Sequence, residues 1–250
     1  MHDSAVAVDG LSLRNVGKRF GTIWVLTDLN IDVHRGEIHG LIGPNGAGKT
    51  TVINIATGIY QPTSGSIALG GTDVTRMPAH LRARHGLGRS FQGARLFDKL
   101  DVRTNIRISV EQRRRHSGES TASAPVLADV ETLMQQTNLD AVASREVGSL
   151  PYGVRKQVEL ARSCGFASRA LLLDEPTAGL APDEIDRVLG IIRSNRDRLA
   201  ILIVEHDMEV IMSMCDRITV IDAGRTLMTG TPAEVQQDPD VISAYLGVDE

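Results

Sequence analysis

The feature that most constrains the fold of this chain is a glycine-rich turn between a mostly apolar run and a predicted helix. Residues 37–43 form the run, and residues 50–57 have a helical pattern that Gly58 ends. The turn reads as a glycine, four further residues and then Gly-Lys-Thr, which is the P-loop pattern. Its residues are Gly43, Pro44, Asn45, Gly46, Ala47, Gly48, Lys49 and Thr50. The order strand, turn and helix predicts a phosphate-binding loop.

The residue types in this turn suit a phosphate group. Successive backbone N–H groups reach phosphate oxygens where no Cβ stands in the way, and the helix N-terminus adds positive potential. Lys49 is expected to reach the β- and γ-phosphates of a nucleotide, and the Thr50 hydroxyl to be a ligand of Mg²⁺. We add Thr51, the next residue, to the candidate nucleotide-binding residues. The alternative interpretation is a glycine turn with a structural role only.

A P-loop needs acidic groups on a neighbouring strand, and one pair stands in a suitable place. Asp174 ends the apolar run 171–173, and Glu175 follows it directly. Alone, such a pair fits a surface turn as well as a site. Beside a P-loop it predicts two roles, in which Asp174 holds hydrated Mg²⁺ and Glu175 polarises the attacking water.

Three single residues are weaker candidates. Gln92 is a candidate Mg²⁺ ligand and nucleotide sensor, although a lone glutamine is usually a surface residue. His206 follows the buried run 201–204, at a strand end where ligands bind in open α/β sheets, but a structural histidine fits there too. Phe20 is placed to stack on adenine, and an aromatic residue of the core at a strand end is the alternative.

The hydrophobic pattern changes twice along the chain, from strand-like to helical and back to alternating strands and helices. Residues 11–16, 29–33 and 66–69 read as short strands, whereas helical periodicity dominates residues 92–149. The apolar runs 171–174 and 200–204 are typical of buried parallel strands, and the helical pattern between them predicts a right-handed crossover. A hairpin of residues 217–221 and 226–228 precedes a helical tail. We therefore expect an α/β core with a helical subdomain.

Net charge and composition limit the partners and the cellular compartment that we expect for such a protein. The net charge is -4, with Lys and Arg interspersed among Asp and Glu, which makes a nucleic-acid partner unfavourable. No apolar run approaches the roughly 18 residues of a membrane span, and the first residues lack a signal-peptide pattern. We expect a soluble cytoplasmic protein whose two cysteines, Cys164 and Cys215, are free thiols. It would serve a membrane only through a partner.

Read in order, these motifs resemble the ATP-binding subunit of an ABC transporter over essentially the whole chain. Besides the P-loop, Asp174-Glu175-Pro176 and the single residues above, residues 150–154 are similar to the family's signature, which opens a helix. The resemblance implies a P-loop core with an antiparallel β subdomain and a helical subdomain. From the helical pattern of residues 92–149 and the helix after it, we expect the helical subdomain at residues 92–164 and the core at residues 1–91 and 165–250. The resemblance also implies ATP and Mg²⁺ as cofactors, and a nucleotide sandwich in which Pro151, Tyr152 and Gly153 face the partner's ATP.

Within that family the chain looks most like the larger ATPase of branched-chain amino acid importers. The similarity is carried by Tyr152, Ala178-Gly179-Leu180, the run Val204-Glu205-His206-Asp207-Met208 and the segments 229–232 and 244–247. Urea and amide importers are similar too. The resemblance implies a peripheral protein on the cytoplasmic face of the cell membrane. Its partners would be permease subunits, a second ABC ATPase in a hetero- or homodimer and, indirectly, a solute-binding protein.

The signature departs from the family pattern. Pro151 stands where a serine is usual, Val154 where a glutamine is usual, and Ala181 replaces the usual aspartate after the Asp-Glu pair. We therefore hypothesise that this chain's P-loop hydrolyses ATP, whereas the site completed by its signature hydrolyses slowly. The alternatives are an exporter ATPase for lipid or drug and a non-transport ABC ATPase. A GTPase is disfavoured, because no Asn-Lys-x-Asp sequence occurs.

Overall fold

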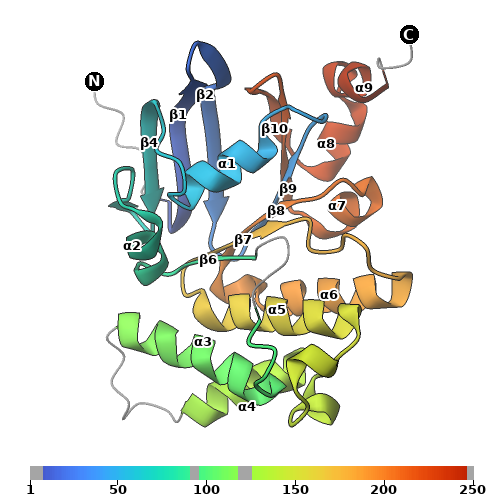
Figure 1. Cartoon of the computed structure of the whole chain (residues 1–250). Helices are drawn as coiled ribbons and strands as arrows, with labels where there is room; N and C mark the ends of the chain where they lie inside the picture. Colours follow the sequence, from blue (N-terminus) through green and yellow to red (C-terminus); the bar gives the residue numbers. More distant parts are fainter. Residues whose placement is uncertain (1–7, 91–95, 118–125, 247–250) are drawn as a thin grey trace.

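Two sheets and a set of helices make up the part of the chain that the computed structural model describes, residues 8–90, 96–117 and 126–246 (Figure 1). The first sheet is antiparallel, with the order β2-β1-β4-β5. Its strands are β1 (Gly10–Phe20), β2 (Ile23–His34), β4 (Ser64–Leu69) and β5 (Thr72–Asp73). β1 and β2 are longer than the runs 11–16 and 29–33, because register shifts carry the pairing onwards. Asn15 and Asp28 lie in these irregular stretches with positive φ, which these two residue types tolerate.

The second sheet is mixed and has the order β10-β9-β3-β8-β7-β6. Its strands are β3 (Ile38–Ile42), β6 (Leu87–Arg89), β7 (Ala170–Asp174), β8 (Ala200–Val204), β9 (Arg217–Asp222) and β10 (Arg225–Gly230). β3 runs parallel to both β8 and β9, and β7 runs parallel to β8. All residues of β3, β7 and β8 are buried, as the apolar runs predict. The carboxyl ends of β3, β7 and β8 therefore meet at one edge of the sheet.

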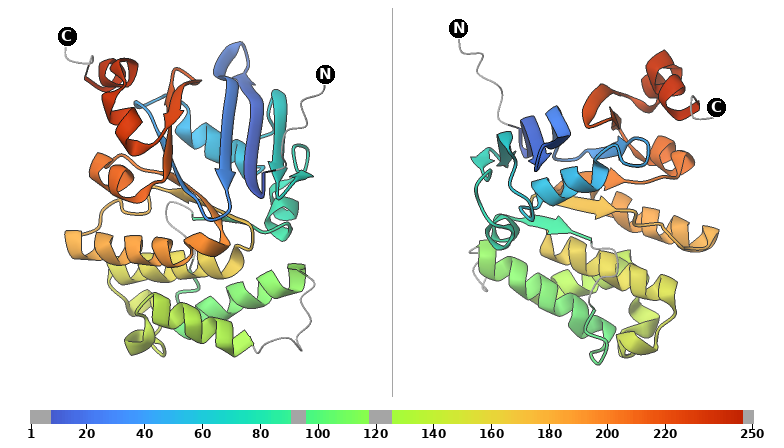
Figure 2. Two further views of the ribbon diagram at one scale, coloured as in Figure 1. Left: turned by 180° about the vertical axis from the view of Figure 1, so that it is seen from behind. Right: turned by 45° about the horizontal axis from the view of Figure 1, so that its top comes forward.

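Helices cover both faces of the mixed sheet (Figure 2). α1 lies between the two sheets and shares a hydrophobic cluster with both of them, while a second cluster on the other face joins the sheet to α3, α4, α5, α6 and α7. The helices are α1 (Lys49–Ala56), α2 (Ala79–Arg84), α3 (Val102–Ser117), α4 (Val126–Gln136), α5 (Tyr152–Phe166), α6 (Pro182–Ser194), α7 (Met208–Met214), α8 (Pro232–Gln237) and α9 (Pro239–Leu246). None of the helices within the described residues has the length and apolar character that a membrane span needs.

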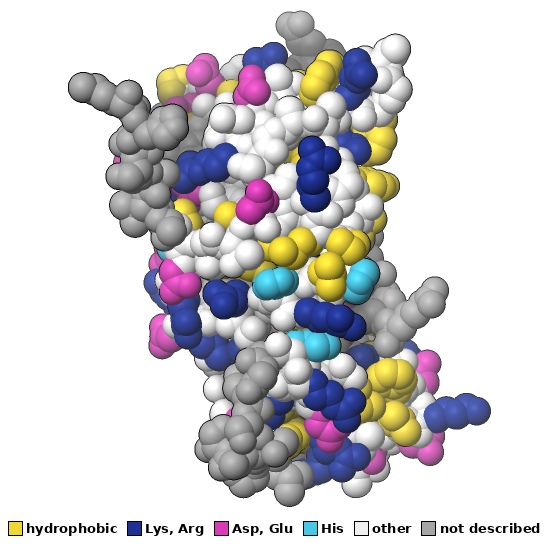
Figure 3. All heavy atoms as spheres, turned by 90° about the vertical axis from the view of Figure 1, so that its left-hand side faces the viewer, with side chains coloured by type: hydrophobic (Ala, Val, Ile, Leu, Met, Phe, Trp, Pro, Cys, Tyr) yellow, Lys and Arg dark blue, Asp and Glu magenta, His cyan; other side chains and the backbone are white. Residues whose placement is uncertain are grey.

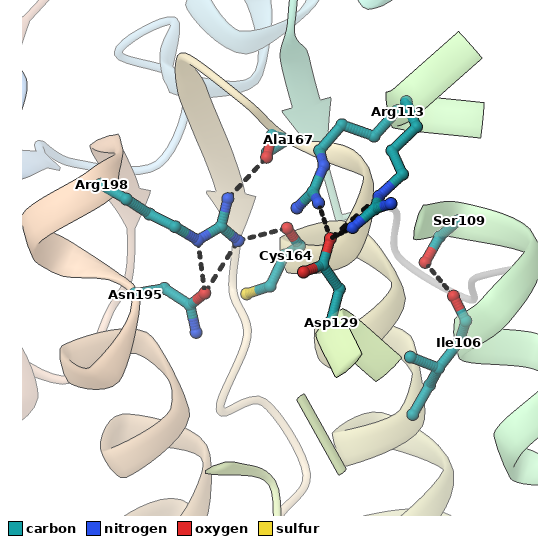
Figure 4. Close-up of polar contacts among 9 residues, drawn as sticks. Ile106, Ser109, Arg113, Asp129, Cys164, Ala167, Asn195 and Arg198 are labelled. Atoms are coloured by element: carbon teal, nitrogen blue, oxygen red, sulfur yellow. Dashed lines mark hydrogen bonds and ion pairs between the residues drawn. The ribbon is translucent and has the colours of Figure 1, made fainter. Parts of the chain in front are cut away.

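Hydrogen bonds from Arg198 join the C-terminal end of α5 to the turn before β8 (Figure 4). Arg198, in the turn before β8, donates to the carbonyl oxygens of Cys164 and Ala167, the latter at 2.8 Å. Asn195 Oδ1 accepts from the same guanidinium group at 2.8 Å. These bonds satisfy carbonyl groups that a helix end leaves open. The thiols of both cysteines are free and buried, and burial raises the pKa of Cys164 to about 12.

The surface of one side is mixed in character (Figure 3). On that face hydrophobic side chains gather at mid-height beside histidines, and Lys and Arg side chains occur in several separate places among Asp and Glu. Some large apolar side chains are exposed among the described residues, including Ile59 and Tyr60 after α1 and Phe97 and Leu100 before α3.

The strand that leads into the P-loop carries a buried polar network. The imidazole of His39 is fully buried, with Nδ1 2.9 Å from Glu37 Oε1 and Nε2 2.8 Å from Thr219 Oγ1. Glu37 Oε2 also accepts from the N–H of His34 at 2.8 Å. Burial acts to raise the pKa of Glu37, but the hydrogen bonds from His39 and His34, together with the charges of His39 and Arg217, outweigh it, so the pKa lies below its ordinary value. The network therefore ties β3 to β9.

We predict that His39→Leu lowers the free energy of unfolding by about 2–3 kcal/mol near neutral pH, because it leaves a buried carboxylate without its main partner. A carboxyl whose pKa is lowered on folding contributes stability above its unfolded pKa, ordinarily 4.5, and loses it as pH falls through the folded value. The two proteins should therefore converge in acid. Urea unfolding across this range measures the effect, with the exposed His80→Leu as control. A constant difference down to the lowest pH would contradict this role of Glu37.

Candidate functional site

The glycine-rich turn lies at the carboxyl end of β3, directly before α1. Gly48 has a φ of +108°, in the region that favours glycine, and a Cβ there would lie 2.7 Å from Leu26 Cδ2. At Gly43 a Cβ would lie 2.1 Å from the carbonyl oxygen of Ile221 on β9. The backbone of the turn is thus packed between β2 and β9, which fixes the direction of its N–H groups.

Lys49, the first residue of α1, turns back into this loop. Its side chain is buried, and Nζ donates to the carbonyl oxygens of Gly43 and Pro44, the latter at 3.0 Å. Burial lowers the pKa of Lys49, and the charges of Glu175 and Asp174 act in the opposite direction. The ammonium group therefore lies in the field of both acids. Of the residues that follow, Thr50 is exposed and Thr51 is half-buried.

Asp174 is the last residue of β7 and is buried at the edge of the sheet. Its carboxylate lies 3.6 Å from the guanidinium of Arg89, at the end of β6. Burial raises the pKa of Asp174, the charge of Arg89 opposes this rise, and the nearby charge of Glu175 adds to it. Arg89 also donates to Asn54 Oδ1 on α1 at 2.8 Å. It therefore links the P-loop helix to the acidic strand end.

Glu175 and His206 meet across the ends of β7 and β8. Glu175 Oε1 lies 2.8 Å from His206 Nε2, and both side chains are partly open to solvent, at 26% and 52% exposure. The backbone of Glu175 has a φ of +49°, which is uncommon for a residue other than glycine, and its N–H donates to the carbonyl of Val204 at 2.9 Å. Left-handed backbone at such a position is typical of functional sites, where neighbouring contacts maintain it.

Glu205 fixes the loop that follows this pair of acids. Its buried carboxylate accepts from the N–H of Thr177 at 2.8 Å and from the Thr177 hydroxyl at 2.6 Å. It therefore joins the segment after β7 to the end of β8. Sequence reasoning missed both Glu205 and Arg89 as parts of the site. The signal for each was a charged residue at the end of a buried strand.

The signature-like residues open α5. Pro151 caps the helix, and Tyr152 is 58% exposed, with its hydroxyl 3.4 Å from the carbonyl of Ala178. Gly153 is buried against Glu184 of α6, and a Cβ on it would lie 1.8 Å from Glu184 Oε1. Within the described residues, no hydrogen bond or ion pair joins these three residues to the P-loop of the same chain.

Two further candidates stand apart from the acids. Phe20 ends β1 with 41% exposure, its ring edge-on to Tyr60 at 5.3 Å between centroids and 4.8 Å from Lys18 Nζ. Gln92 lies outside the described residues. The structure therefore brings Lys49, Asp174, Glu175 and His206 to one edge, and it leaves the role of Phe20 as a prediction.

Known proteins match the chain along almost its whole length. The family model described as ABC transporter matches residues 26–178, and the model described as Branched-chain amino acid ATP-binding cassette transporter matches residues 225–250. The high-affinity branched-chain amino acid transport ATP-binding protein BraF of Pseudomonas aeruginosa is 38% identical, over 95% of this chain and 97% of that protein. LivG of Escherichia coli K12, which has the same description, is 37% identical over the same shares.

Solved structures show the same fold. The ADP conformation of MJ1267, an ATP-binding cassette of an ABC transporter, superposes with a TM-score of 0.79 at 24% identity. The match covers 95% of this chain and 98% of that chain. The antiparallel sheet, the mixed sheet and the helices are thus the architecture of a known class of cassette.

Proposed function

Because the chain belongs to the ABC transporter family of ATP-hydrolysing subunits, we propose that it powers the import of branched-chain or related amino acids. BraF and LivG, which it resembles over nearly its full length, are named for that transport. The observation that supports ATP hydrolysis as the source of power is the Glu175 carboxylate, which lies 2.8 Å from His206 at the sheet edge and whose charge acts on Lys49.

The residues of the P-loop fit a nucleotide with Mg²⁺. Gly43 and Gly48 leave no room for a side chain against β9 and β2. The hydroxyl of the exposed Thr50 and the Asp174 carboxylate are oxygen donors of the type that Mg²⁺ prefers. When bound, Mg²⁺ neutralises charge on the phosphate oxygens. Lys49 would exchange the carbonyl oxygens of Gly43 and Pro44 for phosphate oxygens, and residues 43–51 would cradle the phosphates. Phe20 would stack on the base and Gln92 would complete the cation site.

Glu175 is the residue we assign to the attack of water on the γ-phosphate. Its carboxylate would accept a proton from the water. His206, which lies 2.8 Å from that carboxylate, would hold it in place and contact the γ-phosphate. The charge of Arg89 opposes the rise in the Asp174 pKa that burial and the neighbouring Glu175 cause. The loop bond from Thr177 to Glu205 fixes the backbone that presents both acids.

We propose that residues 1–91 and 165–250 bind the nucleotide and that residues 92–164 pass movement to membrane permease subunits. Phe97 and Leu100 expose apolar surface directly after residues 91–95, and Arg162 of α5 lies 4.9 Å from the Phe97 ring. The protein would act on the cytoplasmic face of the membrane as one half of an ATPase dimer, and a solute-binding protein would deliver the solute.

Removal of this chain from its cell should abolish ATP-dependent uptake of leucine, isoleucine and valine. Re-expression of the wild-type chain should restore uptake, and Glu175→Gln should not, because the dimer would close on ATP without reopening. Radiolabelled uptake over the first minute measures both. If uptake persists without the chain while export of another solute stops, the importer assignment is wrong.

The same assay tests the proposed asymmetry. Pro151 offers neither a hydroxyl nor an N–H to the partner's nucleotide, and Glu184 lies against Gly153. The site built from this signature should therefore hydrolyse slowly. Replacing the equivalent carboxylate in the partner ATPase should leave much of the uptake intact. Equal loss from the two substitutions would argue against the asymmetry.

A further inference from the structure

A cavity of about 310 Å³ lies on the antiparallel sheet beside the first residue of β10. Its lining residues are Gly17, Trp24, Thr27, Asp28, Ser64 and Arg225. It opens on the opposite face of the β1–β2 hairpin from Phe20. Arg19 pairs with Trp24 in the register and its guanidinium lies 5.8 Å from the indole, whereas the next residue, Phe20, packs on Tyr60. The cavity is therefore separate from the P-loop and from the ring proposed to stack on adenine.

Backbone contacts hold three of the segments that line the cavity. The indole of Trp24 rests on Gly17, where a Cβ would lie 3.1 Å from its Cζ3 atom. Asp28 has a φ of +52°, and its carbonyl accepts from Asn30 Nδ2 at 2.8 Å. Arg225 follows Gly224, whose carbonyl accepts from the Thr27 N–H at 2.8 Å and whose Cβ position is 2.0 Å from Val25 O. These contacts restrict the backbone positions from which the side chains of Trp24, Asp28 and Arg225 project.

The cavity holds one charge of each sign. Within the described part of the chain, neither the Asp28 carboxylate nor the Arg225 guanidinium takes part in a side-chain hydrogen bond or an ion pair. The indole and the Gly17 backbone supply an apolar wall, and the hydroxyls of Thr27 and Ser64 add polar atoms. A carboxylate, a guanidinium and an aromatic wall around one space are complementary to a zwitterion with an apolar substituent.

We propose that this cavity binds a free α-amino acid with a small apolar side chain. The ligand's ammonium group would pair with Asp28, its carboxylate with Arg225, and its side chain would lie on Trp24 and Gly17. Asp28 and Arg225 are exposed, so a simple anion or cation would form one charge-assisted contact where a zwitterion forms two. The volume is at the lower end of ligand cavities, which favours a single amino acid over a peptide.

This site lies outside the proposed function, but it is connected to the P-loop. The N–H of Gly224, the residue before Arg225, donates to the carbonyl of Ala47 at 3.1 Å. A ligand that engages Arg225 therefore acts on a turn that is hydrogen-bonded to the nucleotide-binding loop. Such an arrangement suits a ligand whose binding alters the ATPase, and the choice of an amino acid that is also the transported solute rests on the proposed function.

Trp24 makes the test direct, because it is the only tryptophan in the chain and is half-exposed, at 49%. The full-length protein is titrated with L-leucine, with L-leucinamide, which lacks the carboxylate, and with 4-methylpentanoate, which lacks the ammonium group. We expect leucine to produce a saturable change in tryptophan fluorescence with a dissociation constant of about 1 mM or tighter. Each single-charge analogue should bind at least about tenfold more weakly.

Two variants assign the contacts. Asp28→Asn keeps a residue type that tolerates left-handed backbone, and Arg225→Gln removes the guanidinium; each should weaken leucine binding at least about tenfold. Asp197→Asn and Arg76→Gln, exposed positions outside the cavity, make the same charge changes and should leave binding unchanged. No saturable change up to about 10 mM leucine, equal binding of the three compounds, or wild-type binding by both variants would each overturn the proposal. ATP affinity, measured on the same samples, tests the P-loop separately.

Discussion

Glu175→Gln should lower steady-state ATP hydrolysis by a factor on the order of 10²–10⁴ and leave ATP affinity close to that of the wild type. Glutamine has nearly the same shape as glutamate but does not accept a proton from water at neutral pH. The glycine turn and the Lys49 bonds to Gly43 and Pro44 do not involve Glu175, so the contacts assigned to binding remain. Release of inorganic phosphate by the wild-type and variant proteins measures the difference.

The Glu175→Gln substitution removes the proton acceptor while it keeps the local contact of the side chain. Its side chain has a close contact to His206 at 2.8 Å, and glutamine can keep a hydrogen bond there. A loss of hydrolysis therefore results from the missing proton acceptor and not from a disrupted structure at the end of β7. Glu146→Gln, an exposed glutamate before α5, serves as the matched control and should hydrolyse ATP like the wild type. Undiminished hydrolysis by Glu175→Gln would refute the assignment of the base.

Lys49→Ala should weaken ATP binding itself, by about tenfold or more. The substitution removes the ammonium on which the charges of Glu175 and Asp174 act, and with it the positive charge expected to face the β- and γ-phosphates. It also removes the donor to the carbonyl oxygen of Gly43, whereas the Pro44 carbonyl keeps its bond from the Ala47 N–H, at 3.2 Å. Calorimetric titration with ATP measures the affinity. Lys99→Ala, at an exposed position before α3, should bind ATP normally; wild-type affinity in Lys49→Ala would contradict the role of the lysine.

Much of the fold could be predicted because the decisive signals are local. The P-loop pattern and the apolar runs of β3, β7 and β8 lie within short segments, and their burial follows from composition alone. The helix expected at residues 50–57 spans Lys49–Ala56, and Gly58 follows it with a positive φ, as predicted. The expected hairpin of residues 217–221 and 226–228 is β9 and β10.

The parts that sequence reasoning missed depend on contacts between distant segments. Arg89 pairs with Asp174 only because β6 lies beside β7, and Glu205 binds Thr177 only because β8 lies on the other side of β7. The extension of β1 and β2 depends on irregular pairing around Asn15 and Asp28, which no periodicity reveals. Similarly, Trp24, Asp28 and Arg225 share a cavity although β10 lies far from β2 in the chain.

The most direct test of ATP hydrolysis at this sheet edge is to measure ATP affinity and phosphate release on the same preparations of wild-type, Glu175→Gln and Lys49→Ala protein. We predict that the two substitutions separate. Glu175→Gln should keep its affinity and lose hydrolysis, whereas Lys49→Ala should lose affinity as well. If both variants bind and hydrolyse ATP like the wild type, or if Glu175→Gln loses binding while Lys49→Ala retains it, the proposed division between the P-loop lysine and the strand-end glutamate is contradicted.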